Sequence, residues 1–168
     1  MSPLEPIVCR ESPRKVLEED FKSLHGKLPI HGGWGYTKAD ACIIDKNDPI
    51  VIQGIPFDGV EIEHLFVEKR IYEEMIIFRS DDEKFSGITW KLLKQELIVE
   101  AERVYDKLSF SVTAFPDKDW EKLRIEWEGP AGHRSPTFDQ AAHEQRRRQR
   151  MINITREFWF EITSFYGS

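Results

Sequence analysis

The sequence has little cysteine and no long apolar run. Two of its 168 residues are cysteines, Cys9 and Cys42, which allow at most one disulfide, so a reduced chain is the simpler expectation. No apolar run approaches the roughly 20 residues that a membrane-spanning helix needs. Residues 1–15 lack the charged and apolar regions of a signal peptide. The sequence therefore predicts a cytoplasmic protein without a membrane partner.

The chain also lacks an excess of positive charge. It has 24 Lys and Arg residues against 30 Asp and Glu residues, which gives a net charge of −6. A non-specific nucleic-acid-binding protein normally carries a basic face, so nucleic acid is not an expected partner. The exception is the block Arg146–Arg150, which has no interleaved aromatic residues for base stacking. RNA contact through this block is our third hypothesis, and the exposed face of a helix is the simpler interpretation.

Sequence motifs for catalysis and metal binding are missing as well. The histidines form no H-E-x-x-H pattern, no G-x-S-x-G is present, and the acidic run from Asp45 lacks the glycine and glutamate of a calcium loop. We therefore predict no catalytic residue, no metal ligand and no cofactor. The alternative hypothesis is a small enzyme that uses His64 with Glu68, four residues apart on a helix, or His31 beside the glycine turn. A solvated helix face with ion pairs is the simpler explanation of His64 and Glu68.

The residues that are present specify a hydrophobic core. Apolar residues make up 40% of the chain and aromatic residues 12%, more than a disordered chain contains. The length fits one domain, which we place at residues 12–168 after a flexible tail of residues 1–11. Ser12 followed by Pro13 predicts a helix start, and Gly26 can end that helix.

The first half of the domain mixes helical and strand patterns. The sequence predicts a short buried strand at residues 41–45 and a loop at residues 50–58. A wide apolar stripe favours a helix over residues 60–79, with a strand at its end as the alternative. Residues 88–105 fit either a helix or a strand that changes phase at a bulge.

The second half contains the clearest strand. Residues 107–115 alternate apolar and hydroxyl side chains, and Pro116 ends the run. Apolar spacing predicts a helix that ends at Gly129 and another that begins at Thr137. Residues 151–165 fit a continued helix or a terminal strand. Because no regular βαβ order exists, the expected fold is a single α+β domain with an antiparallel sheet packed against helices.

Glycine is concentrated in LPIHGGWGYTKADACIIDKNDP, residues 28–49. The glycine cluster at residues 32–35 matches neither a Walker phosphate loop nor the G-x-G-x-x-G fingerprint of dinucleotide-binding proteins. Glycine permits positive φ angles and close backbone approach. The cluster therefore predicts a structural turn that presents Trp34 and Tyr36, rather than a phosphate-binding loop.

Aromatic and acidic residues together indicate a surface for a protein partner. Exposed aromatic side chains anchor interfaces, and acidic charge accelerates association with a basic protein. The predicted partner-binding residues are the aromatic residues of the glycine turn and the carboxylates that follow it: Trp34, Tyr36, Asp45, Asp48, Glu68, Glu73 and Glu74. The expected partner is a basic protein, and the sequence leaves a homodimer open.

Three stretches carry a resemblance to a family of small bacterial proteins. They are residues 28–49, FVEKRIYEE and TAFPDKDW, and the resemblance covers most of the chain from residue 28 onward. Small acidic bacterial proteins of this kind resemble immunity proteins, which bind and neutralise a cognate toxin. This resemblance implies a protein-binding function and a toxin as partner, and it identifies no functional residue.

Overall fold

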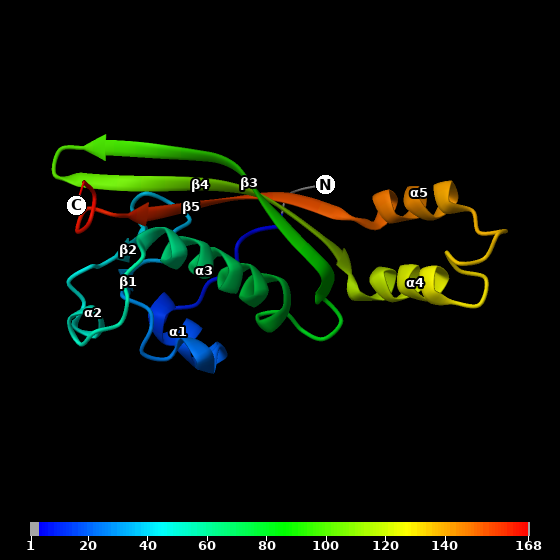
Figure 1. The fold of residues 1–168 in the computed structure, drawn as a ribbon, viewed down its shortest axis with the longest axis horizontal. Coiled ribbons are helices and arrows are strands. Elements are labelled where there is room, and N and C mark those ends of the chain that lie inside the picture. The colour runs from blue at the N-terminus through cyan, green and yellow to red at the C-terminus, as the bar shows by residue number, and fades with distance from the viewer. Residues whose placement is uncertain (1–3, 168) are drawn as a thin grey trace.

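The computed structural model describes residues 4–167, which fold into one α+β domain. The predicted fold class is confirmed. One sheet has the strand order β1-β2-β5-β4-β3 (Figure 1). Its strands are β1 (Ile30–Gly32), β2 (Cys42–Ile44), β3 (Phe85–Glu100), β4 (Arg103–Pro116) and β5 (Ile152–Glu161). The α-helices are α1 (Pro13–Asp20), α2 (Pro49–Ile52), α3 (Gly59–Tyr72), α4 (Asp117–Glu128) and α5 (Gln140–Arg150).

Residues 88–105 form most of a long antiparallel hairpin. β3 and β4 pair from Phe85 opposite Pro116 to Glu100 opposite Arg103. The register shifts between Leu92 and Lys94, which is the change of phase that the strand interpretation required. On either side of this bulge, the apolar positions match the period of a helix as well as that of a strand. The sequence alone therefore also fitted a helix.

Residues 151–165 contain a strand and do not continue the last helix. α5 ends at Arg150, and β5 follows with Ile154, Phe158 and Phe160 buried at every second or fourth position. Burying each of these side chains contributes about 1.5–3 kcal/mol, which a helix projecting from the domain would forgo. β5 is antiparallel to β4 but parallel to β2, so the sheet is mixed where the sequence predicted an antiparallel one.

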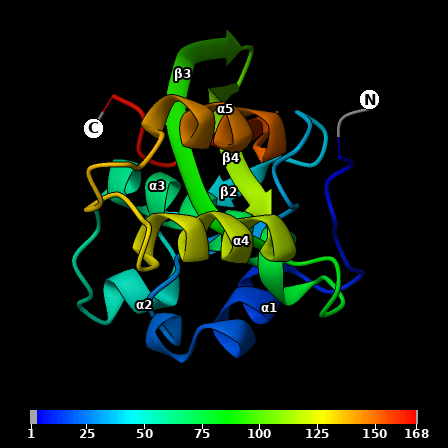
Figure 2. The ribbon, with the colours of Figure 1, turned by 90° about the vertical axis from the view of Figure 1, so that its right-hand side faces the viewer.

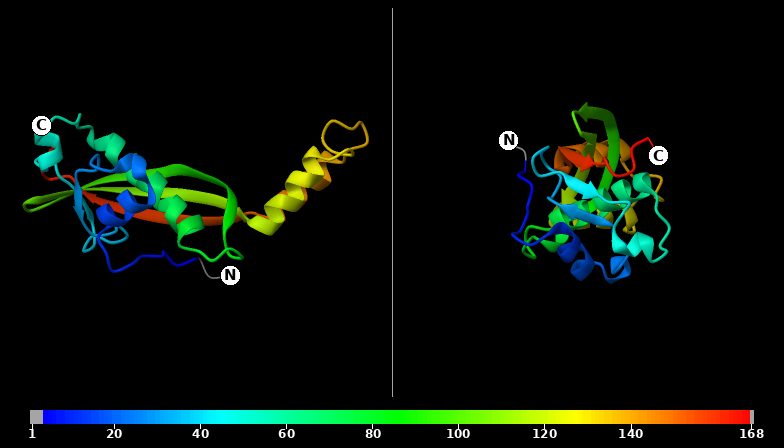
Figure 3. Two further views of the ribbon diagram at one scale, coloured as in Figure 1. Left: turned by 90° about the horizontal axis from the view of Figure 1, so that it is seen from below. Right: turned by 90° about the vertical axis from the view of Figure 1, so that its left-hand side faces the viewer.

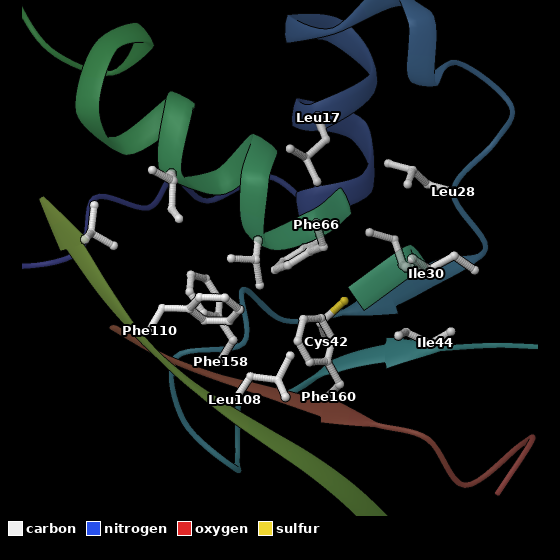
Figure 4. Close-up of a cluster of buried hydrophobic side chains, with 14 of the residues drawn as sticks. Leu17, Leu28, Ile30, Cys42, Ile44, Phe66, Leu108, Phe110, Phe158 and Phe160 are labelled. Carbon is white, nitrogen blue, oxygen red and sulfur yellow. The ribbon is translucent and has the colours of Figure 1, made fainter. Parts of the chain in front are cut away.

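α3 packs on one face of the sheet and forms the centre of the core. Figure 4 shows Phe66 of α3 facing β5, where its ring lies edge-on to Phe158 at 6.4 Å and to Phe160 at 5.4 Å between centroids. Cys42 of β2 is buried beside them, and burial raises the pKa of its thiol. A thiol buried in this way is not a reactive nucleophile. After Tyr72 the helix continues as a π-helical turn, Glu73–Ile77.

Two short elements lie where the sequence predicted loop or turn. α2 occupies Pro49–Ile52 because Asp48 caps it, with its Oδ1 accepting from the Ile50 backbone N–H at 3.1 Å. β1 pairs with β2 inside the glycine-rich stretch. Elements of three or four residues are too short to show a hydrophobic period, so the sequence does not reveal them.

The N-terminal region packs against the domain ahead of β1. α1 begins after Ser12, whose Oγ accepts from the Lys15 backbone N–H at 3.4 Å, and a 3₁₀ turn at Lys22–Leu24 follows it. Residues 4–11, predicted as a flexible tail, contain no helix or strand. Their backbone carbonyls accept hydrogen bonds from the side chains of Arg156, Arg70 and Trp34.

α4 and α5 form a two-helix arm, residues 117–150, which connects β4 to β5. Figures 2 and 3 show both helices side by side at one end of the sheet, projecting away from α1–α3. Two carboxylates in the first turn of α4, Asp117 and Asp119, suit the positive end of the helix dipole. Asp139 caps α5, with its Oδ1 accepting from the Ala142 backbone N–H at 3.0 Å, two residues after the predicted start at Thr137.

Candidate protein-binding groove

The arm carries an open groove of about 560 Å³ between its two helices. Three apolar side chains, Trp120, Leu123 and Trp127, share one face of α4 because they are spaced by one or two helical turns. Met151, the C-cap residue of α5, adds to the same floor. The remaining lining residues are Arg124, Glu128, His143, Glu144, Arg147 and Arg148. The groove therefore has an apolar floor and a charged rim.

The arm is attached to the sheet through Trp120. Its ring lies 5.2 Å from the Phe115 ring of β4, between centroids. Gly87 of β3 has a φ of 59°, and a Cβ there would lie 2.5 Å from the indole ring. Glycine at this position thus allows the indole to lie directly against the sheet.

An aromatic cluster closes the far end of the arm. Trp127 stacks on His133 at 4.4 Å with an interplanar angle of 4°, and it meets Phe138 edge-on at 5.7 Å. His143 of α5 is buried beside these rings, with its Nδ1 2.6 Å from Oε1 of Glu126 on α4. The cluster fixes the spacing of the two helices and therefore the width of the groove.

Several charges on the arm are paired within it. Glu126 also accepts from Arg146 Nε at 3.0 Å, and the hydrogen bonds from Arg146 and then His143 lower the pKa of that carboxyl group. Arg124 bonds to Glu121 and, at 2.9 Å, to Glu128. Arg150 lies 3.9 Å from Asp119. The basic block lies on an exposed helix face, as the simpler interpretation expected, and two of its arginines pair with acidic residues of α4.

Two arginines on the rim of the groove, Arg147 and Arg148, differ from these paired residues. Arg147 places its guanidinium 5.4 Å from the Phe115 ring centroid, and Arg148 is exposed. Within residues 4–167, neither of these side chains forms an ion pair. These two guanidinium groups can therefore form ion pairs with carboxylates of a bound partner.

Comparisons with family models, curated proteins and solved structures found no match for this chain. Among residues 4–167, no three His, Cys, Asp or Glu side chains lie close enough together to hold a metal ion. In the same range, no helix is long and apolar enough to cross a membrane.

The predicted presentation of Trp34 and Tyr36 to a partner is wrong. Trp34 is 6% exposed, its Nε1 donates to the Cys9 carbonyl at 3.2 Å, and the Arg70 guanidinium lies 4.2 Å from its ring centroid. Tyr36 accepts from Arg70 at 2.9 Å, and burial raises the pKa of its phenol. Both rings turn inward because Arg70 offers a cationic surface that covers them.

Glu73 and Glu74 are also buried, so their predicted role at a partner surface is a second error. Glu73 accepts from Arg70 at 2.8 Å, and Glu74 accepts from Arg156 Nε at 3.0 Å. Burial, followed by a hydrogen bond with Asp20, raises the pKa of Glu73 to about 8. The burial of Glu73 and Glu74 is not evident from the sequence, because acidic residues at the end of an amphipathic helix normally face solvent.

The other predicted contact residues are scattered. Asp45 lies 3.4 Å from His31 and accepts from the Asn47 backbone N–H, which forms a local turn. Asp48 is buried, since it caps α2 and pairs with Arg14 at 2.7 Å. Glu68 lies 3.8 Å from Lys69 on α3. The seven predicted residues therefore do not form one exposed surface.

The structure does not bring together the residues that the alternative enzyme hypothesis requires. His64 lies edge-on to Phe110 at 6.2 Å, while Glu68 meets Lys69. His31 meets Asp45 at the surface and does not line the groove of the arm. No nucleophile, base and orienting group come together around either histidine within residues 4–167.

The glycine cluster is a structural turn, as predicted. Gly32 and Gly35 have φ angles of 86° and 88°, and Asp40 closes the turn by accepting from the Trp34 backbone N–H at 3.1 Å. A Cβ on Gly33 would lie 1.9 Å from Asp40 Oδ1 and 2.3 Å from its backbone oxygen. The backbone N–H groups of this turn therefore bind the chain itself rather than a phosphate.

We expect Gly33→Ala to lower the free energy of unfolding by about 1–3 kcal/mol, because the added methyl group displaces Asp40. Urea unfolding followed by circular dichroism measures the loss. Gly26→Ala is the control: its Cβ would meet nothing within 4 Å, so only the strain of its φ of 71° remains. Equal losses in the two variants would contradict the crowding at Gly33.

Proposed function

We propose that this chain is a protein-binding module that holds a partner segment in the groove of the arm. The observation that carries the proposal is the open apolar floor between two projecting helices. Leu123 is the buried residue of α4, and His143 that of α5. A helix pair usually covers its apolar stripe with a further layer, so a floor left open favours a partner as that layer.

The chemistry of the groove favours an amphipathic partner segment. The floor of Trp120, Leu123, Trp127 and Met151 accepts apolar side chains spaced as on one helix face. Arg147 and Arg148 on the rim favour carboxylates on the same segment. This differs from the basic partner that the net charge suggested, because the exposed contact surface carries local charge of the opposite sign.

A cognate toxin is the partner that we propose, acting in the cytoplasm. The resemblance of the chain to immunity proteins supports this setting, and the groove supplies a surface for direct contact. In this proposal the toxin offers a helical segment with apolar and acidic side chains, and binding covers or displaces a part of the toxin that its activity requires.

The test is binding to the toxin encoded beside this chain, measured by calorimetry with purified proteins. We expect Arg148→Glu to weaken binding about tenfold, because a like charge then faces the acidic side of the segment. Arg148 forms no ion pair within residues 4–167, so the substitution breaks no internal contact between charges.

Lys122→Glu is the matched control, since it reverses an exposed charge on α4 outside the groove lining. We expect this variant to bind like the wild type. Failure of the wild type to bind the toxin would remove the immunity function, and equal weakening by the two variants would remove the groove as the contact site.

A further inference from the structure

β3 is an edge strand along its whole length. It lies at one end of the strand order, and within residues 4–167 it pairs only with β4. Figure 1 shows the second half of β3, which ends at its arrowhead, along the upper border of the sheet, with no described element beyond it. In an antiparallel pair, alternate residues direct their backbone N–H and C=O groups away from the neighbouring strand. A strand of 16 residues thus leaves a row of backbone donors and acceptors open.

The same strand exposes large apolar side chains. Leu93, Leu97 and Val99 are 56%, 52% and 60% exposed, and Leu92 is 37% exposed. Leu97 and Val99 lie opposite Asp106 and Val104 of β4, which are buried. A long, exposed edge with apolar side chains is a template for another strand, and folded proteins normally protect such an edge.

The order of charges on β3 identifies what fits this edge. The part of β3 before Leu97 carries Lys91, Lys94 and Glu96, and the part after Leu97 ends with Glu100. An antiparallel pair of two β3 strands brings the first part of one copy against the second part of the other. With Leu97 opposite itself, Lys94 lies opposite Glu100, and two-fold symmetry repeats the pair.

We propose that β3 pairs with β3 of a second copy of this chain, antiparallel and centred on Leu97, so that one sheet runs through both copies. Lys94 now lies 3.4 Å from Glu96, and Glu100 lies 2.8 Å from Lys38. These ion pairs are solvent-exposed and easily exchanged for contacts across the dimer. The Glu100 end of β3 and the arm lie at opposite ends of the sheet in Figure 1, so the dimer leaves the groove open.

Charge reversal tests the pairing directly. The mass of the full chain is measured by light scattering during size-exclusion chromatography, over about a hundredfold range of concentration. The wild type is expected to form a dimer. Lys94→Glu alone and Glu100→Lys alone are each expected to be monomeric, because two like-charge pairs then face each other. An equimolar mixture of the two variants restores the dimer, since each charge meets its opposite.

Two controls fix the register. Lys91→Glu reverses a charge on β3 outside the paired residues, and it keeps the dimer. Leu97→Cys, in a chain with Cys9→Ser, forms a disulfide-linked dimer on oxidation because the two-fold axis brings both thiols together. Leu92→Cys in the same background does not.

A wild type that stays monomeric at every concentration would overturn the proposal. It would also be overturned if both single reversals left the dimer intact. A monomer that bound an extended peptide along β3 would assign the edge to a different protein. Circular dichroism of each variant separates loss of pairing from loss of fold, and the fold is retained because the changed side chains are exposed.

Discussion

Replacing Arg70 with alanine is expected to lower the free energy of unfolding by about 3–5 kcal/mol, the cost of breaking a buried ion pair from one side. The Arg70 side chain is fully buried. It donates to Glu73 at 2.8 Å, to the Ile7 carbonyl at 2.7 Å and to Tyr36 at 2.9 Å, and it covers the Trp34 ring. The substitution leaves these acceptors buried without their donor.

Arg124→Ala is the matched control. Arg124 also has two carboxylate partners, but its side chain is 46% exposed, so water replaces the lost contacts and little or no loss of stability is expected. Urea unfolding of both variants measures the difference. A loss for Arg70→Ala as small as that for Arg124→Ala would show that the buried network contributes no stability.

Adding Glu73→Gln to Arg70→Ala tests the origin of the loss. Arg70 opposes the rise in the pKa of Glu73 that burial and Asp20 cause. Without Arg70, the carboxyl group has to take up a proton or remain charged in the core. The amide needs neither, so the double variant is expected to be more stable than Arg70→Ala at pH 8.

The burial of Trp34 illustrates what a single sequence does not contain. Helices and strands were predictable wherever apolar residues kept one period over several turns, as in α1, α3, α4 and β4. Trp34 faces Arg70 only after the chain has folded, and no local pattern joins residues so far apart. The aromatic and acidic residues that suggested an exposed binding surface are instead members of this buried network.

The groove of the arm was predictable in part. The spacing of Trp120, Leu123 and Trp127 indicates an apolar helix face, and such a face normally packs in the core of a domain. α5 has too few apolar residues to cover this face of α4. That shortage was the signal in the sequence that the face stays open. His143 and Met151 were missed, and Arg148 was considered only as part of a possible RNA contact, because their place in the groove depends on how α5 lies against α4.

Glu63→Gln is expected to make the chain progressively more stable than the wild type as pH rises from 5 to 9. Glu63 of α3 is 2% exposed. Burial, and then a hydrogen bond and charge repulsion from Asp106 of β4, raise the pKa of Glu63 to about 9 from the ordinary value of 4.5. Gln95 of β3 donates to both carboxylate oxygens of Asp106, at 3.1 and 2.8 Å, and so holds it in place.

The sign of the effect follows from proton binding. The unfolded chain loses the Glu63 proton near pH 4.5, whereas the folded chain keeps it to about pH 9. The contribution of this group to stability is therefore complete below pH 4.5. Between pH 4.5 and about pH 9, the contribution of Glu63 to stability falls by at most about 1.4 kcal/mol per pH unit. Glutamine does not titrate in this range, so the stability of the variant does not fall with pH for this reason.

Urea unfolding at several pH values from 5 to 9 measures the difference between variant and wild type. Glu61→Gln, an exposed position on the same helix, is the control for removing one negative charge. A difference that stayed constant across this range would mean that Glu63 is already ionised in the folded protein. The Glu63–Asp106 pair would then be two buried negative charges, and a cation would have to lie close to them.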